Sequence, residues 1–169
     1  MRDVLLSRNF SGCVLRLDCG LTSDQYQRTI PAHPTLLCLG RTESLGVKGL
    51  DIFASAAGHL TKLWRAHSST KERPSPRFMV RGAKDDAEEL ESKLTQIAKA
   101  VASNTEILVR PYTSEREELE AEFRAASIFL MPSREEGFGL VACEALSLGV
   151  PAIVTSESGI AEVIREIAN

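Results

Sequence analysis

Two glutamates flank a glycine-rich turn in the second half of the chain and could bind a ligand together. Glu136 and Glu144 lie eight positions apart, separated by Gly137-Phe138-Gly139 and the start of an apolar helix. Glycine allows a backbone to approach a ligand closely, and the first turn of a helix offers N–H groups to polar or anionic atoms. In the alternative interpretation, Glu136 is a carboxylate at a helix start and Glu144 lies on a narrow polar stripe. That alternative leaves both glycines without a role beyond the turn, so we predict a ligand site.

Two cations flank a second predicted helix start. Arg41 follows Gly40 at the end of an apolar run, and Lys48 precedes Gly49 at the start of the next helix. A guanidinium fork and a mobile ammonium beside a helix N-terminus suit a diphosphate group. The alternative is that both are solvated surface charges, as most lysines and arginines are, and these two residues alone do not decide against it. The glycine patterns of dinucleotide-binding and P-loop proteins are absent after this run.

Short apolar runs alternate with helical periodicity from residue 35 onward. Strands are expected at residues 35–40, 77–81, 106–109, 127–131 and 152–155, and helices at 49–66, 85–102, from 114, 139–148 and 160–167. Ser114 and Glu117 have the spacing of a capping box at the start of the third helix. Because the strands show no polar alternation, we predict an α/β fold with a Rossmann-like parallel sheet and helices on both faces.

Parallel sheets of this kind bind ligands beyond the carboxyl ends of their strands. Four polar or glycine-containing segments directly follow predicted strands: Arg41, 81–82, 110–112 and 132–139. All four are therefore expected at one edge of the sheet, where the two glutamates and the two cations would meet.

Composition limits the classes of function. A chain of 169 residues with 43% hydrophobic residues suits one domain with one core. A net charge of −3 predicts no nucleic-acid partner. There is neither an apolar run of membrane-spanning length nor a signal-peptide core, so we expect a cytoplasmic location and no membrane span. The cysteines are Cys13, Cys19, Cys38 and Cys143. They form no C-x-x-C pair, so we expect them to be reduced and buried and to form no metal site.

Taken together, these motifs resemble the C-terminal half of a GT-B glycosyltransferase of family 4. The residues from Glu136 to Glu144 match the family's E-x7-E signature, and 40–51 resembles its G-R…K-G-x-D motif. The segments 149–154 and 159–164 match its closing G-x-P-x-V and G-x-x-E-V-I motifs, and 19–26 weakly resembles an N-terminal family motif. The resemblance covers about residues 18 to 167.

The resemblance implies a nucleotide-sugar donor site of a retaining hexosyl transferase. Arg41 and Lys48 would hold the diphosphate, Glu136 would contact the sugar hydroxyls, and Glu144 would accept hydrogen bonds from the ribose. The resemblance implies further donor contacts at Gly137, Phe138, Gly139, Leu140, Arg110 and Tyr112, the last two beside the base. No metal or other cofactor is implied, because the two cations would neutralise the leaving group.

The resemblance also implies a division of the chain and leaves two alternatives open. Residues 1–34 are expected to be an opening segment and linker, and 35–169 the nucleotide-sugar-binding domain, truncated before the family's usual last segment. A GT-B enzyme needs a second, N-terminal domain for its acceptor, so catalysis by this chain alone stays undecided. The alternatives are a non-catalytic sensor or interaction module in a larger protein, and a GT-B relative such as a sugar-nucleotide epimerase or phosphorylase.

Overall fold

The computed structural model describes residues 29–42, 45–67 and 74–168. Its helices and strands follow one another in the order β1 (Thr35–Leu39), α2 (Leu50–Ala66), β2 (Arg77–Ala83), α3 (Ala87–Val101), β3 (Leu108–Pro111), α4 (Arg116–Ala125), β4 (Ile128–Met131), α5 (Leu140–Ser147), β5 (Ala152–Val154) and α6 (Gly159–Ala168). The predicted alternation of strands and helices is confirmed. The motif at 19–26 and the cysteines Cys13 and Cys19 lie outside the described residues.

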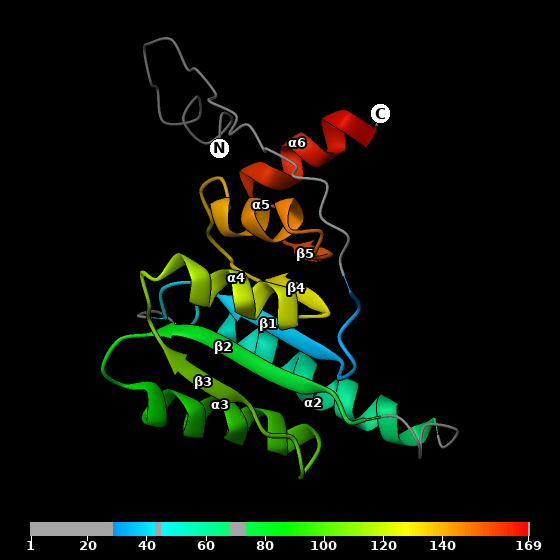
Figure 1. Cartoon of the computed structure of the whole chain (residues 1–169). Coiled ribbons are helices and arrows are strands. Elements are labelled where there is room, and N and C mark those ends of the chain that lie inside the picture. Colours follow the sequence, from blue (N-terminus) through cyan, green and yellow to red (C-terminus); the bar gives the residue numbers. More distant parts are fainter. Residues whose placement is uncertain (1–28, 43–44, 68–73, 169) are drawn as a thin grey trace.

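The five strands form one parallel sheet in the order β3-β2-β1-β4-β5 (Figure 1). The described part of the sheet starts at the central strand β1, adds β2 and β3 on one side, and then adds β4 and β5 on the other. Leu37 of β1 pairs with Met79 of β2 and with Phe129 of β4. The strand order therefore reverses between β1 and β4, and ligands of such sheets bind outside the carboxyl ends of the strands at this point.

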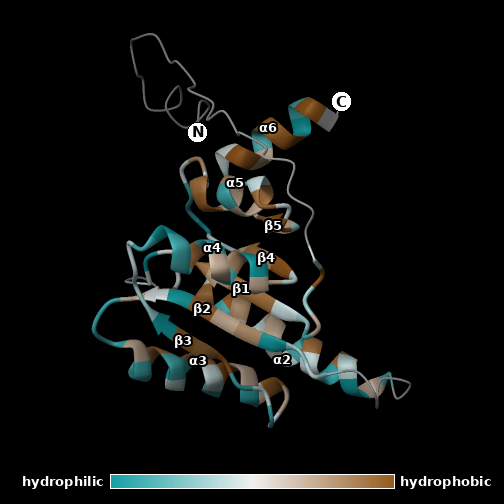
Figure 2. Ribbon diagram, viewed as in Figure 1, coloured by the Kyte–Doolittle hydropathy of each residue, from teal (hydrophilic) through white to brown (hydrophobic). Residues whose placement is uncertain are grey.

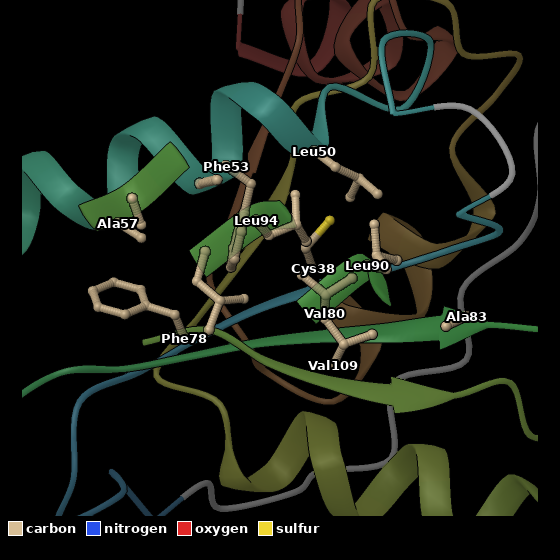
Figure 3. Close-up of a cluster of buried hydrophobic side chains, with 13 residues drawn as sticks. Cys38, Leu50, Phe53, Ala57, Phe78, Val80, Ala83, Leu90, Leu94 and Val109 are labelled. Atoms are coloured by element: carbon tan, nitrogen blue, oxygen red, sulfur yellow. The ribbon is translucent and has the colours of Figure 1, made fainter. Parts of the chain in front are cut away.

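One face of the sheet is covered by α2 and α3. Strand side chains such as Cys38 and Val80 pack there against Phe53 of α2 and against Leu90 and Leu94 of α3. Figure 3 shows these side chains gathered between α2 and the strands. Phe53 and Leu94 are almost fully removed from solvent, and burying a large apolar side chain is worth about 1.5–3 kcal/mol.

The opposite face of the sheet is covered by α4 and α5. Leu37, which precedes Cys38, packs on this face with Phe129 of β4 and Phe123 of α4. The rings of Phe123 and Phe129 meet edge to face with centroids 5.7 Å apart, a favoured aromatic arrangement. Helices on both faces explain why the strands are apolar throughout, and they confirm the predicted Rossmann-like α/β fold (Figure 1).

The helices are amphipathic and the strands are apolar. Figure 2 shows hydrophobic residues in the strands and many hydrophilic positions on α3 and α4. In α3 the buried residues Leu90, Leu94 and Ala98 recur at helical spacing, while its remaining positions face solvent or are partly covered. Within the described ranges, none of the helices has the length and apolar character needed to cross a membrane.

Two strands end later than the sequence predicts. β2 continues to Ala83, and β3 covers Leu108–Pro111 instead of 106–109, because Ala83 pairs with Pro111. As a result Arg81 and Arg110 lie opposite each other inside the sheet, and the prediction that they follow strand ends is wrong.

The predicted capping box at the start of α4 is also wrong. The N-cap residue is Glu115, which has extended dihedrals and no side-chain hydrogen bond to the helix start. Thr113 Oγ1 accepts the N–H of Glu115 at 3.1 Å. A hydroxyl that bonds its neighbouring backbone in this way favours a turn over a helix, so the helix begins two residues after Ser114.

Candidate functional site

A pocket of about 160 Å³ opens at the carboxyl ends of β1 and β4, where the strand order reverses. Its walls come from the end of β1, the start of α2, the end of β4 and the start of α5. The pocket brings together five of the predicted site residues: Arg41, Lys48, Glu136, Gly139 and Leu140. The expectation that these segments meet at one edge of the sheet is therefore confirmed for the two cations and the first glutamate.

The charges in this pocket are organised around Glu136. Lys48 Nζ donates to Glu136 Oε2 at 2.9 Å, and Ser133 Oγ donates to the same oxygen at 3.1 Å. The side chains of Lys48 and Glu136 are only 31% and 19% exposed, and Ser133 is buried. Lys48 is thus not a solvated surface charge. Arg41 is exposed and lines the same pocket.

The position of Lys48 depends on the glycine that follows it. Gly49 is the N-cap of α2 and has a φ of 64°, a left-handed value that side chains rarely adopt. A Cβ at this position would collide with the carbonyl of Pro132. The start of α2 can therefore lie directly against the loop after β4, which brings Lys48 beside Glu136.

The Gly-Phe-Gly turn joins the pocket to the last helix. Gly139 is the N-cap of α5 with a φ of 90°, and a Cβ there would lie 2.7 Å from Met131 Cε. The carbonyls of Gly137 and Phe138 accept the first N–H groups of α6, from Gly159 and Ile160, both at 2.8 Å. Gly137 and Phe138 therefore hold α6 in place, and contact of their N–H groups with a ligand stays a prediction.

Glu144 lies on the exposed side of α5 and lines a different pocket, of about 410 Å³. This second pocket lies between α4 and α5, and Ser114, Arg116 and Ser147 contribute to its wall. The pKa of Arg116 is raised mainly by a hydrogen bond to Glu120 and to a smaller degree by the charge of Glu144. The two glutamates of the motif thus face separate pockets, one at the strand ends and one between the helices.

The two residues expected beside a base lie in neither pocket. Arg110 points its guanidinium to Glu122 Oε1 at 3.0 Å and lines a third, open pocket near His33 and Asn104. Tyr112 is 64% exposed, and its N–H donates to the carbonyl of Ala83. A base contact of either side chain stays a prediction.

Comparison with known proteins decides the family. A model described as "Family 4 Glycosyltransferase in conflict systems" matches residues 2–169. The chain belongs to this family of glycosyltransferases. The D-inositol 3-phosphate glycosyltransferase of Xylanimonas cellulosilytica is 29% identical over 136 residues, which are 80% of this chain and 29% of the relative. The chain therefore spans about 29% of the length of that curated relative.

Solved structures place this glycosyltransferase domain in the C-terminal half of the GT-B fold. The C-terminal domain of a glycosyl transferase group 1 family protein, LpcC of Francisella tularensis, is 24% identical with a TM-score of 0.58, covering 77% of this chain and 62% of that one. S. aureus TarM, crystallised with UDP, has a TM-score of 0.68 at 13% identity, covering 92% of this chain and 28% of that one. The predicted family and fold are confirmed.

Sequence reasoning missed the role of Ser133 in the glycosyltransferase domain. Ser133 is buried directly after β4 and donates to Glu136. Its position three residues before Glu136, at the exit of a strand, is the signal that could have indicated a supporting hydrogen bond.

Arg81 was expected at the rim of the sheet, but it is committed to a buried ion pair. Its Nη2 lies 2.6 Å from Glu122 Oε1, and the two side chains are 10% and 5% exposed. Arg81 Nη1 also donates to the carbonyl of Pro111 at 2.8 Å. The pair therefore ties β2 to α4 and to the end of β3.

Cys38 lines the first pocket of the glycosyltransferase domain without being reactive. Burial raises the pKa of its thiol to about 12, so the thiol stays protonated at neutral pH and is a poor nucleophile. Cys143 is buried as well, and the prediction of buried thiols is confirmed for these two residues. In residues 29–42, 45–67 and 74–168, no three or more His, Cys, Asp or Glu side chains cluster as a metal ion would require.

Proposed function

We propose that this domain binds the nucleoside diphosphate sugar of a retaining hexosyl transferase. The observation that carries the proposal is the pocket at the strand-order reversal, where Arg41 and the Lys48–Glu136 pair lie at the start of a helix. A lysine, an arginine and helix N–H groups form a receptor for a diphosphate. The TarM structure contains UDP, which makes a uridine nucleotide the first ligand to test.

Within this pocket the proposed roles follow the chemistry of each side chain. Arg41 and Lys48 would bind the diphosphate, and Glu136 would accept hydrogen bonds from sugar hydroxyls. Lys48 and Glu136 neutralise each other in this pocket, at 2.9 Å. Each side chain therefore holds the other in place, while Lys48 could still donate to a phosphate and Glu136 could still accept from a hydroxyl. The N–H groups of Gly139 and Leu140, at the start of α5, would add neutral donors.

The second pocket would take the nucleoside. Glu144 would accept hydrogen bonds from the ribose hydroxyls. Arg110 and Tyr112 line neither of the two pockets, so they would contact the base only if it extends beyond the second pocket. A nucleoside diphosphate would then extend from the pocket of Glu144 to that of Lys48, with Gly137 and Phe138 between the two glutamates in sequence.

Transfer requires the bond between the sugar's anomeric carbon and a phosphate oxygen to break, which leaves negative charge on the diphosphate. Arg41 and Lys48 would stabilise that charge as it develops, without a metal. The acceptor hydroxyl would come from a site on an N-terminal GT-B domain of a longer protein, since the chain spans about 29% of a curated relative.

Calorimetric titration of the 169-residue chain with UDP, GDP and ADP, in the presence of EDTA, tests the proposal. We expect one of the three nucleotides to bind with a dissociation constant of millimolar order or below, and EDTA to leave that constant unchanged. Binding of none of them would favour the non-catalytic module, and binding that requires a divalent ion would overturn the metal-free site.

Glu144→Gln should weaken binding of the ribonucleotide several-fold. Glutamine keeps one acceptor oxygen but loses the charge, and charge-assisted hydrogen bonds are about twice as strong as neutral ones. Because Glu144 is exposed, the melting temperature should not change. The measurement is the affinity ratio of UDP to 2′-deoxy-UDP, which should be large for the wild type and small for the variant. Glu88→Gln, an exposed change on α3, serves as control, and an equal ratio in all three proteins would remove Glu144 from the ribose site.

A further inference from the structure

Arg134 forms several hydrogen bonds beside the first pocket, although it does not line that pocket. Its Nη1 donates to Asp51 Oδ1 at 2.8 Å and its Nη2 to Asp51 Oδ2 at 2.7 Å, which is a bidentate pair. Nη1 also donates to the carbonyl of Gly46 at 2.7 Å. One side chain in the loop after β4 thus holds both the first turn of α2 and the loop that precedes it.

The backbone beside Arg134 makes a second set of contacts to the same loop. The N–H of Arg134 donates to the carbonyl of Val47 at 2.8 Å, and the N–H of Glu135 approaches that carbonyl at 3.4 Å. Lys48 follows Val47, and Glu136 follows Glu135. The two residues that form the central ion pair of the pocket are therefore each adjacent to a residue held in this network.

The contacts of Arg134 are poorly explained by stability alone. The side chains of Arg134 and Asp51 are 48% and 41% exposed, and exposed ion pairs contribute little to the free energy of folding. A planar fork on a carboxylate does fix direction and distance. The hydrogen bond from Arg134 also lowers the pKa of Asp51, because it favours the charged form of the carboxylate.

We propose that Arg134 is a positioning residue, which with Asp51 fixes the loop 45–48 so that Lys48 meets a bound diphosphate at the same place as Glu136. The inference rests on the proposed diphosphate site and adds the contacts that hold Lys48 in position there. We call the contacts of Arg134 with Asp51 and Gly46 the clamp. Without the side chains of Arg134 and Asp51, the backbone bonds to Val47 would remain, but the carbonyl of Gly46 and the first turn of α2 would no longer be bound by the same side chain.

The first test is a mutant cycle read out by calorimetry with UDP and with uridine. Arg134→Ala should weaken UDP binding roughly 3- to 10-fold, within the coupling range of residues that share one network. Uridine binding, assigned to the second pocket, should not change. In a Lys48→Ala background, Arg134→Ala should not weaken UDP binding further. In the otherwise wild-type protein, Arg134→Lys should bind UDP more tightly than Arg134→Ala. Arg165→Ala, which removes an exposed arginine of α6, is the control.

Three results of this cycle would overturn the inference. One is full UDP affinity in Arg134→Ala. Another is an equal loss for UDP and uridine, which would indicate a general structural effect. The last is an undiminished effect in the Lys48→Ala background, which would mean that Arg134 contacts the diphosphate itself.

Hydrogen exchange of the unliganded protein tests the clamp without any ligand. The N–H of Gly49 donates to the carbonyl of Gly46 at 3.2 Å, and that of Leu50 to Leu45 at 3.0 Å. Both amides should exchange several-fold faster in Arg134→Ala and in Asp51→Asn, and at the wild-type rate in Arg165→Ala. Faster exchange in a protein that binds none of UDP, GDP and ADP would reject the proposed function and keep the clamp. Unchanged exchange would reject the clamp whatever the protein binds.

Discussion

Glu122→Ala is expected to destabilise the domain by roughly 3 kcal/mol, the lower end of the 3–5 kcal/mol found when one partner of a buried ion pair is removed. Glu122 is buried and neutralises Arg81 at 2.6 Å and Arg110 at 3.0 Å. Without it, two neighbouring arginines of the sheet would lose their shared carboxylate, and the half-exposed Glu118 lies farther from Arg81, at 3.5 Å. Urea unfolding measures the change as a shift of the midpoint.

Two further variants make this result interpretable. Glu117→Ala removes an exposed carboxylate from the first turn of the same helix, and it should change the unfolding midpoint only slightly. Arg81→Met combined with Glu122→Leu replaces the buried pair by apolar groups and should recover most of the stability, as such replacements are often neutral or better. A Glu122→Ala protein as stable as the wild type would show that the pair does not hold α4 to the sheet.

Lys48→Ala is expected to cost ~1.5–3 kcal/mol of affinity for a nucleoside diphosphate, the value of a hydrogen bond to a charged group. This corresponds to a dissociation constant that is about 10- to 150-fold higher. The loss should be specific to the diphosphate, because Lys48 lines the pocket of Arg41 and Glu136 and is absent from the wall of the second pocket. Calorimetry with UDP and with uridine measures both values.

Lys62→Ala is the matched control for this prediction. Lys62 is an exposed lysine on α2. Lys62→Ala therefore changes the net charge by the same amount as Lys48→Ala but removes no side chain that lines the pocket. The control should bind UDP within twofold of the wild type at physiological salt, where exposed charges are screened beyond about 8 Å. Equal losses in the two variants would mean that net charge, and not a contact, attracts the diphosphate.

The architecture could be predicted from the sequence because its signals are local. Apolar runs without alternation indicate strands buried on both faces, and the helical spacing of residues such as Leu90 and Leu94 indicates one buried stripe. Gly139 and Gly149 bracket α5 as positive-φ residues. These features depend on neighbouring residues along the chain, so no long-range contact had to be known.

The errors concern positions that are decided by contacts between distant segments. The sequence predicts that Arg81 lies at the edge of the sheet. In the structure its guanidinium is buried, because it donates to Glu122, 41 positions later in the chain. The start of α4 depends on which hydroxyl, Thr113 or Ser114, takes a backbone N–H. Local patterns offer both choices, and only the folded chain selects one.

Five of the predicted site residues line one pocket, but the geometry of the site was not predicted. The segments of Lys48 and Glu136 were expected at the same edge of a parallel sheet, and the structure places the two side chains 2.9 Å apart. The spacing of Glu136 and Glu144 suggested one shared site, whereas the helix between them turns Glu144 toward α4 and a second pocket. The clamp of Arg134 on Asp51 joins residues 83 positions apart, and no sequence motif describes it.

The central claim is that one nucleoside diphosphate occupies both pockets, and amide chemical shifts measured by NMR during titration test it most directly. UDP, or whichever of GDP and ADP binds, should shift the signals of Gly139 and Leu140 in the first pocket and of Glu144 and Ser147 in the second. Inorganic pyrophosphate should shift only the first pair of signals, and the free nucleoside only the second. Shifts confined to the open pocket around His33 and Asn104, or an identical pattern for pyrophosphate and nucleoside, would contradict the account.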